Sequence, residues 1–272
     1  MIRLILLTLL GMSVASASVP GDLHNVTSDT SQTRTIPNNE AEAIIDKAVQ
    51  KLGGDRYLKV TSQVSRGKFS VIRDGVIVSF QSFIDVIVYP DKERTEFKGN
   101  KNKFVQTNVG STGWTFDSDY ELIKVQTDAQ IENFHRGIRV SLDTLLRGGW
   151  KGKGQIEYAG KRQASLGKRN DVVRLKYEDG LTIDFEFADD GTPMKASYKK
   201  ANAEGEETTE EDRYAQWVDV SGIRTPYIVD RFTNGKPTSR INYESLEYNV
   251  RVPESIFDKP SNPKELKKDL KL

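Results

Sequence analysis

The chain lacks cysteine altogether: none occurs among its 272 residues. This absence excludes disulfide bonds, thiol chemistry and cysteine ligands for a metal ion. It also excludes the lipid anchor of bacterial lipoproteins, because that lipid is attached to a cysteine at the cleavage point of the signal sequence. A chain of this length can nevertheless bury enough apolar surface to fold without covalent links.

Histidine is nearly as scarce, with only His24 and His135. Neither belongs to an HExxH pattern, and the sequence contains no GxSxG, Walker or dinucleotide-binding pattern. The acidic stretches at residues 117–119 and 189–191 resemble parts of calcium loops, but the glutamate that closes an EF-hand is missing. We therefore expect no catalytic residue, no metal site and no cofactor.

The sequence also lacks an excess of either charge, with 40 Lys and Arg against 39 Asp and Glu. Charges of both signs are interspersed along the chain, which is typical of a solvated sheet face. Proteins that bind nucleic acid normally carry a clear basic excess, so we expect no nucleic-acid partner.

Long apolar runs are absent except at the N-terminus, from Leu4 to Val14. This run is shorter than the roughly 20 residues that span a bilayer, and the small residues Ala15 and Ala17 complete the pattern of a secretory signal peptide. We expect a signal peptide at residues 1–17 and a mature protein that is periplasmic or secreted, and soluble. Residues 18–37 are rich in Ser, Thr, Asn and Asp, which predicts a flexible leader.

Two segments carry apolar residues at helical spacing. The first begins after Asn38 or Asn39, places one apolar stripe between Ala41 and Leu52, and ends at Gly53-Gly54. The second runs from Thr127 to Arg147 and is closed by Gly148-Gly149.

Elsewhere the apolar period is two, which predicts strands with one dry and one wet face. The clearest examples are residues 76–89 and 181–187. Successive hairpins in a meander would give about ten or eleven strands. The strands are separated by dipeptides typical of tight turns: Asp74-Gly75, Asp179-Gly180, Asp190-Gly191, Glu204-Gly205, Ser221-Gly222 and Asn234-Gly235.

Together these elements predict an α+β fold, in which a curled antiparallel β-sheet forms an unclosed barrel covered by two or more α-helices. We expect one domain at residues 38–260, followed by a Pro- and Lys-rich tail at residues 261–272. A curled sheet can fill its interior with side chains or leave room for an apolar ligand, and the sequence leaves both open.

Five short motifs follow one another along the chain: Leu52-Gly53-Gly54 before Leu58-Lys59-Val60, Tyr89-Pro90-Asp91-Lys92-Glu93-Arg94, Gly113-Trp114-Thr115-Phe116, Gly222-Ile223-Arg224-Thr225-Pro226, and Val252-Pro253 to Phe257 with Pro260. Their order resembles the LolA-like outer-membrane lipoprotein-sorting family, which includes lipoprotein carriers and the sensor domain of MucB/RseB-type regulators. The resemblance implies a hydrophobic cavity under a helical lid that shields acyl chains in the periplasm. It carries over no catalytic residue.

We therefore expect a non-catalytic periplasmic carrier or binder of lipids or lipidated proteins, with lipid acyl chains or lipoproteins as its ligands. Its partners would be an inner-membrane donor and an outer-membrane acceptor, and the protein itself is expected to be a monomer. The side chains expected to line the cavity are apolar and include three on the helical lid: Val78, Phe80, Ile84, Val86, Trp114, Phe116, Leu175, Ile183 and Phe185 on strands, and Phe134, Ile138 and Leu142 on the lid.

Two other functions stay open. The first is an envelope sensor or interaction module that binds a partner protein, although regulators of this type carry a second domain for which this chain has little room. The second is a hydrolase that acts through carboxylates. It is disfavoured because only Trp114, Trp150 and Trp217 are available as tryptophan platforms for a sugar.

Overall fold

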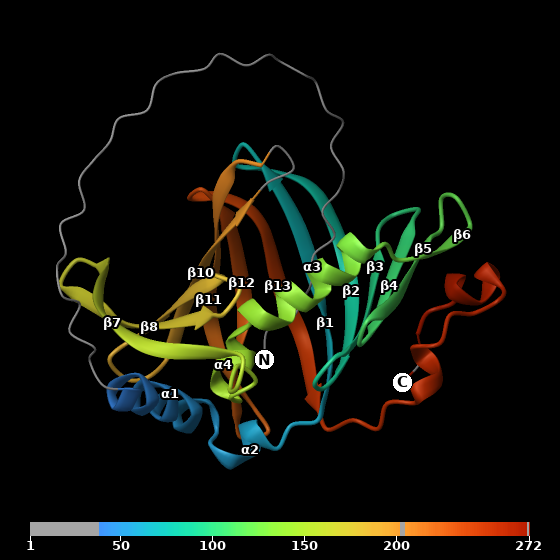
Figure 1. Ribbon diagram of the computed structural model, residues 1–272. Coiled ribbons are helices and arrows are strands. Elements are labelled where there is room, and N and C mark those ends of the chain that lie inside the picture. Colours follow the sequence, from blue (N-terminus) through green and yellow to red (C-terminus); the bar gives the residue numbers. More distant parts are fainter. Residues whose placement is uncertain (1–37, 202–204, 271) are drawn as a thin grey trace.

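The computed structural model describes residues 38–201, 205–270 and 272, so the expected signal peptide and leader at residues 1–37 lie outside the described residues. Within the described part, thirteen strands form one antiparallel sheet (Figure 1). In chain order they are β1 (Ser62–Arg73), β2 (Val76–Val88), β3 (Lys92–Lys98), β4 (Lys103–Val109), β5 (Thr112–Asp117), β6 (Leu122–Val125), β7 (Gly154–Ser165), β8 (Lys168–Tyr177), β9 (Thr182–Phe187), β10 (Pro193–Ala201), β11 (Glu207–Val220), β12 (Ile223–Thr233) and β13 (Lys236–Tyr248).

The sheet consists of two meanders that meet at its centre. Strands β1 to β6 extend in one direction and β7 to β13 in the other, and β1 pairs with β13 where the two meanders join. The edge strands β6 and β7 do not pair with each other among the described residues, so the barrel is not closed. The predicted α+β class and unclosed antiparallel barrel are confirmed.

Four α-helices lie in the described ranges: α1 (Asn38–Leu52), α2 (Asp55–Leu58), α3 (Asp128–Val140) and α4 (Leu142–Leu146). The predicted stripe of α1, including Ala41, Ala48 and Leu52, is buried in the main core. Helices α3 and α4 connect the two edge strands β6 and β7, so this connection has to cross one face of the sheet (Figure 1). We call the face covered by the helices the inner face and the opposite face the outer face.

The second predicted helix, from Thr127 to Arg147, is divided in two at Ser141. Ser141 has an extended backbone (φ −71°, ψ 146°), and its hydroxyl accepts a hydrogen bond from the backbone N–H of Thr144, which starts α4. A serine that caps a new helix can keep the apolar residues on both sides at helical spacing. The apolar period alone therefore did not reveal the bend.

The predicted turn dipeptides connect the strands. At Asp74-Gly75 both residues have positive φ angles, 51° and 77°, which the tight hairpin turn between β1 and β2 requires. Ser221-Gly222 and Asn234-Gly235 have the same conformation, whereas Glu204 lies outside the described residues. The strand count exceeds the expected ten or eleven, since short strands such as the four-residue β6 give too little alternation to be recognised.

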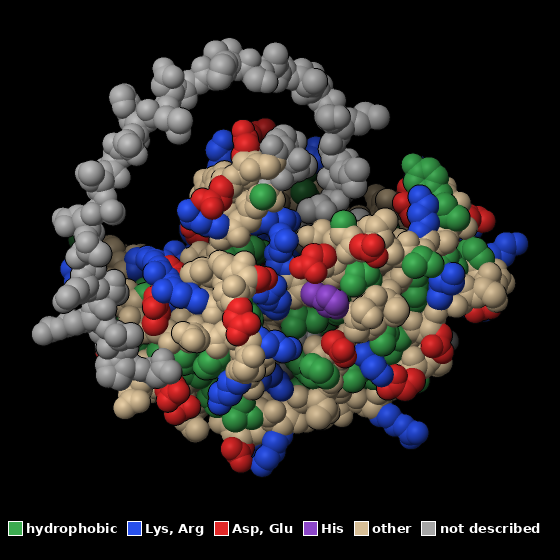
Figure 2. Space-filling model, in the orientation of Figure 1, with side chains coloured by type: hydrophobic (Ala, Val, Ile, Leu, Met, Phe, Trp, Pro, Cys, Tyr) green, Lys and Arg blue, Asp and Glu red, His purple; other side chains and the backbone are tan. Residues whose placement is uncertain are grey.

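Both faces of the sheet bury apolar side chains. The main core joins α1 and α4 to the inner face of strands from both meanders. On the outer face, the chain after β13 packs across the first meander: Ile256 and Phe257 contact the cluster of Val64 and Val86, and Leu266 covers Trp114 and Phe116. None of the helices in the described ranges is long and apolar enough to span a membrane. Acidic and basic side chains are interspersed over the molecular face shown in Figure 2.

Candidate ligand-binding surface

Four aromatic rings, which we call the aromatic stripe, cross the inner face from β13 to β3. Phe83 contacts Tyr243 edge-on at a centroid distance of 5.7 Å and Phe97 at 6.4 Å, and Phe69 contacts Phe97 at 5.5 Å. All four are buried. Gly67 lies between Tyr243 and Phe83 in the register, and a Cβ atom there would lie 2.9 Å from the Phe83 ring. The glycine therefore leaves the space in which the rings meet.

Further along β1 to β4, the same face becomes polar. Residues two apart on a strand share a face, and direct cross-strand partners lie side by side. The register therefore aligns two rows of inner-face positions next to the aromatic stripe. Ile87 is the one apolar residue in these two rows. We call the seven polar residues of these rows the polar stripe: Ser65, Asp85, Thr95 and Gln106 in one row, and Gln63, Glu93 and Asn108 in the other.

Six of the seven residues of the polar stripe are buried and Gln106 is half-buried, yet several of the buried atoms have no hydrogen-bond partner. Thr95 donates its hydroxyl to Asp85 Oδ1 at 2.7 Å, but Asp85 Oδ2, Ser65 Oγ and both amide atoms of Gln63 have no partner among the described residues. The hydroxyl of Tyr243, on the neighbouring aromatic stripe, is also unpartnered. Each such group costs about 1–3 kcal/mol of stability, and native proteins hold only a few per hundred residues. Their concentration on adjacent strands makes this surface a candidate for binding a polar ligand.

The environment of Asp85 disfavours its ionised form. Burial raises the pKa of Asp85 well above its usual range, and the nearby Glu93 raises it further, while the hydrogen bond from Thr95 acts in the opposite direction. The protonated carboxyl group can donate a hydrogen bond as well as accept one.

The helical cover is held to the rest of the molecule at two points. On α3, Phe134 is buried, and His135 Nε2 lies 3.0 Å from the carbonyl oxygen of Gly110 in the β4–β5 turn. On α4, the buried carboxylate of Asp143 accepts the hydroxyl groups of Tyr57 at 2.6 Å and Tyr89 at 2.9 Å. Helix α3 runs across the inner face (Figure 1).

Solved structures share this architecture at low sequence identity. A DUF1329 family protein from Desulfovibrio piger matches with a TM-score of 0.57 and 14% identity, covering 80% of this chain and 97% of that chain. A LolA superfamily protein from Nitrosomonas europaea (TM-score 0.52, 13% identity) and a putative outer membrane lipoprotein-sorting protein domain from Vibrio parahaemolyticus (0.53, 10%) match over the same shares. The fold is LolA-like. No protein-family model and no curated protein sequence matches the chain.

Within this LolA-like fold, the twelve residues expected to line a cavity fall into three groups. Six lie on the inner side of the molecule: Leu142, Leu175, Ile183 and Phe185 are buried in the main core, Phe134 is buried on α3, and Ile138 is half-buried there. Four belong to the clusters beneath the C-terminal segment: Ile84, Val86, Trp114 and Phe116. The last two, Val78 and Phe80, are 53% and 60% exposed near the end of the β1–β2 hairpin.

The inward orientation expected for Ile84, Val86, Trp114 and Phe116 is therefore corrected. Period-two alternation separates two faces of a strand but does not say which face is inside. The outer face of the first meander buries these apolar side chains because residues of the C-terminal segment cover them, and Trp114 Nε1 donates a hydrogen bond to the carbonyl oxygen of Phe257 at 2.9 Å. Whether any of the twelve contacts a ligand stays a prediction.

The residues of the aromatic and polar stripes were not among the expected site residues. On β2, Phe83 and Asp85 occupy the odd-numbered positions, while the more uniformly apolar even-numbered positions suggested the opposite face. A mixed aromatic and polar face resembles a solvent-exposed one in the sequence. Only the pairing with β1 and β3 brings these side chains together.

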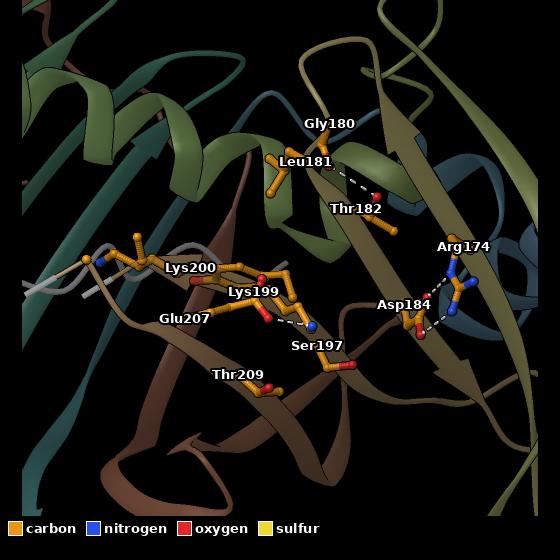
Figure 3. Close-up of a pocket in the computed structure, with 13 residues that line it drawn as sticks. Arg174, Gly180, Leu181, Thr182, Asp184, Ser197, Lys199, Lys200, Glu207 and Thr209 are labelled. Carbon is orange, nitrogen blue, oxygen red and sulfur yellow. Dashed lines mark hydrogen bonds and ion pairs between the residues drawn. The ribbon is translucent and has the colours of Figure 1, made fainter. Parts of the chain in front are cut away.

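Two hollows open to solvent away from the aromatic and polar stripes. One, of about 620 Å³, lies between the ends of β9, β10 and β11 (Figure 3). Arg174 forms an ion pair with Asp184 there, and Lys199 forms one with Glu207 at a distance of 2.5 Å. A second, of about 410 Å³, is bordered by Trp114, Val125 and Phe257 at the C-terminal segment.

Proposed function

We propose that this protein is a non-catalytic periplasmic binder of acyl chains, which are presented by free lipids or by lipidated proteins. The observation that carries the proposal is the aromatic stripe, an apolar surface on the inner face of a LolA-like fold. The structural similarity to a putative outer membrane lipoprotein-sorting domain supports this class of ligand. Binding requires the ligand to enter between α3 and the sheet, since the four rings are buried.

The chain length of the ligand gives the sharpest test. Burying one methylene contributes about 0.8 kcal/mol, which corresponds to about a fourfold change in the dissociation constant. We expect the purified protein to take up fluorescent fatty acids with an affinity that increases by about this factor per methylene from eight to twelve carbons. Protein that is empty on solvent extraction and mass spectrometry, and that takes up no such probe, would contradict the proposal.

A variant pair locates the surface. Phe97→Gln, at a buried ring of the aromatic stripe, is expected to weaken uptake at least tenfold, because it replaces hydrocarbon with an amide. Phe80→Gln, at an exposed position of the same sheet, should leave uptake unchanged. Circular dichroism of both variants is the control for folding. Equal losses in the two variants would argue against the inner face as the binding surface.

One observation favours the second candidate, an interaction module. Val76, Ile77, Val78 and Phe80 are each more than half exposed on one strand of the β1–β2 hairpin, and exposed apolar patches often mark interaction sites. This hairpin would contact a partner protein while the inner face stays free for the ligand. Phe80→Gln would then lose partner capture and keep lipid uptake.

A further inference from the structure

The polar stripe limits which ligand the inner face can accept. Buried atoms without a partner lie on Gln63 and Ser65 of β1 and Asp85 of β2, and the hydroxyl of Tyr243 on β13, in the neighbouring aromatic stripe, adds a fourth residue. All four residues are at least nine-tenths buried and lie on the face that α3 covers. Since these groups are withheld from water and from one another, a ligand group placed here would gain the hydrogen bonds that the protein alone does not make.

The charge of the stripe selects the sign of that ligand group. Its seven residues include two carboxyl groups, Asp85 and Glu93, and neither lysine nor arginine. On the neighbouring strands of this face, Arg231 lies 3.3 Å from Asp212 and is thus already engaged. A donor-rich cation would meet carboxyl acceptors here and would favour their ionised form, whereas an anionic head group would find no opposite charge within the stripe.

The neighbouring rings complement the same kind of group. Phe83 lies two residues from Asp85 on β2, and Tyr243 on β13 pairs with the residue of β1 that lies two positions from Ser65. Both rings therefore border the polar stripe. Aromatic faces attract alkylammonium groups, and they also provide hydrocarbon surface for a tail. The two stripes together therefore suit an amphiphile whose polar end is a positively charged nitrogen.

We propose that the polar stripe binds a protonated amine head group, with the hydrocarbon tail of the same molecule along the aromatic stripe. This proposal rests on the proposed acyl-chain binding and adds the chemical class of the ligand. In the complex, the ammonium group donates hydrogen bonds to Asp85 Oδ2 and to the amide oxygen of Gln63. The hydroxyl groups of Ser65 and Tyr243 complete the contacts around it.

The test compares three amphiphiles with the same twelve-carbon tail: dodecylammonium, dodecanoate and monododecanoylglycerol. Each displaces a neutral fluorescent probe from the full mature chain at neutral pH, below its micellar concentration. We expect dodecylammonium to displace the probe at a concentration about tenfold lower than the other two require, which corresponds to one charge-assisted hydrogen bond. Asp85→Asn should reduce this preference to less than threefold. The matched control Asp74→Asn, at an exposed turn position, should retain it in full.

Tyr243→Phe provides a second variant that removes only one hydroxyl group. It should weaken the binding of dodecylammonium about threefold and leave the binding of dodecanoate unchanged. A preference that persists in Asp85→Asn and Tyr243→Phe would mean that the stripe holds only water, and would overturn the proposal. Equal or better displacement by dodecanoate would do the same, and so would a clear preference for the glyceride. In each of these cases acyl-chain binding itself would stand, whereas displacement by none of the three, without uptake of the probe, would instead refute the proposed function.

Discussion

Two buried tyrosines differ in what their hydroxyl groups contact. Tyr57 donates to Asp143 at 2.6 Å, whereas the hydroxyl of Tyr243 has no partner. We expect Tyr57→Phe to lower the free energy of unfolding by about 1–3 kcal/mol, because it removes a hydrogen bond to a buried carboxylate. Tyr243→Phe should not lower it and should raise it by up to about 1–3 kcal/mol, because the variant removes a buried hydroxyl group without a partner. Urea unfolding of both variants measures the difference, and equal costs would mean that the Tyr243 hydroxyl is bonded in solution.

Asp85 makes the stability of the protein depend on pH. Its folded-state pKa is raised by burial and by Glu93, while the unfolded value is about 3.9. The folded state therefore holds the proton more tightly, and stability that is fully present below about pH 4 is lost as the pH rises toward the folded pKa. We expect Asp85→Asn to be more stable than the wild type at neutral pH and to lose less between pH 4 and pH 8. Asp74→Asn should follow the wild type throughout, and an identical pH profile for Asp85→Asn would contradict the buried acid.

At the scale of single elements, the sequence predicted the structure correctly wherever a pattern of neighbouring residues is compatible with only one local conformation. The stripe of α1 and its glycine stop were predicted correctly, and so was the β1–β2 turn at Asp74-Gly75, because both depend on neighbouring residues alone. The bend at Ser141 and the inner face of β2 were not. They depend on what packs against the element, and the C-terminal segment that covers the outer face is distant from β2 in the sequence.

The C-terminal segment is expected to be an integral part of the sheet's outer face rather than a free tail. Leu266 is buried against Trp114 and Phe116 within a short 3₁₀ helix, Pro263–Lys267. Leu266→Ala should speed amide hydrogen exchange in this segment and in β5 at least tenfold, because the removed contacts hold the segment in place. Leu122→Ala, at a half-exposed position of β6, is the matched control and should have little effect. Rapid exchange of the segment in the wild type would contradict this packing.

At the scale of the whole molecule, one core belongs to both meanders. Phe83 and Phe97 of the first meander lie in the same buried cluster as Ile183 and Phe185 of the second, and α1 and α4 add side chains to it. Neither meander can therefore expose its inner face without uncovering the other. Since β1 and β13 also pair directly, loss of one half removes the strand partner at the centre of the sheet.

We therefore expect the chain to unfold in a single cooperative step. Phe83→Ala and Phe185→Ala should each cost about 3–5 kcal/mol, and each should shift the unfolding midpoint of both meanders equally. Hydrogen exchange followed by mass spectrometry resolves β4 and β8 as separate probes, one from each meander. Two transitions, or a midpoint shift confined to the meander that carries the substitution, would show that the halves are independent. In that case ligand entry could proceed by opening one meander, whereas a shared core requires α3 to move while the sheet stays intact.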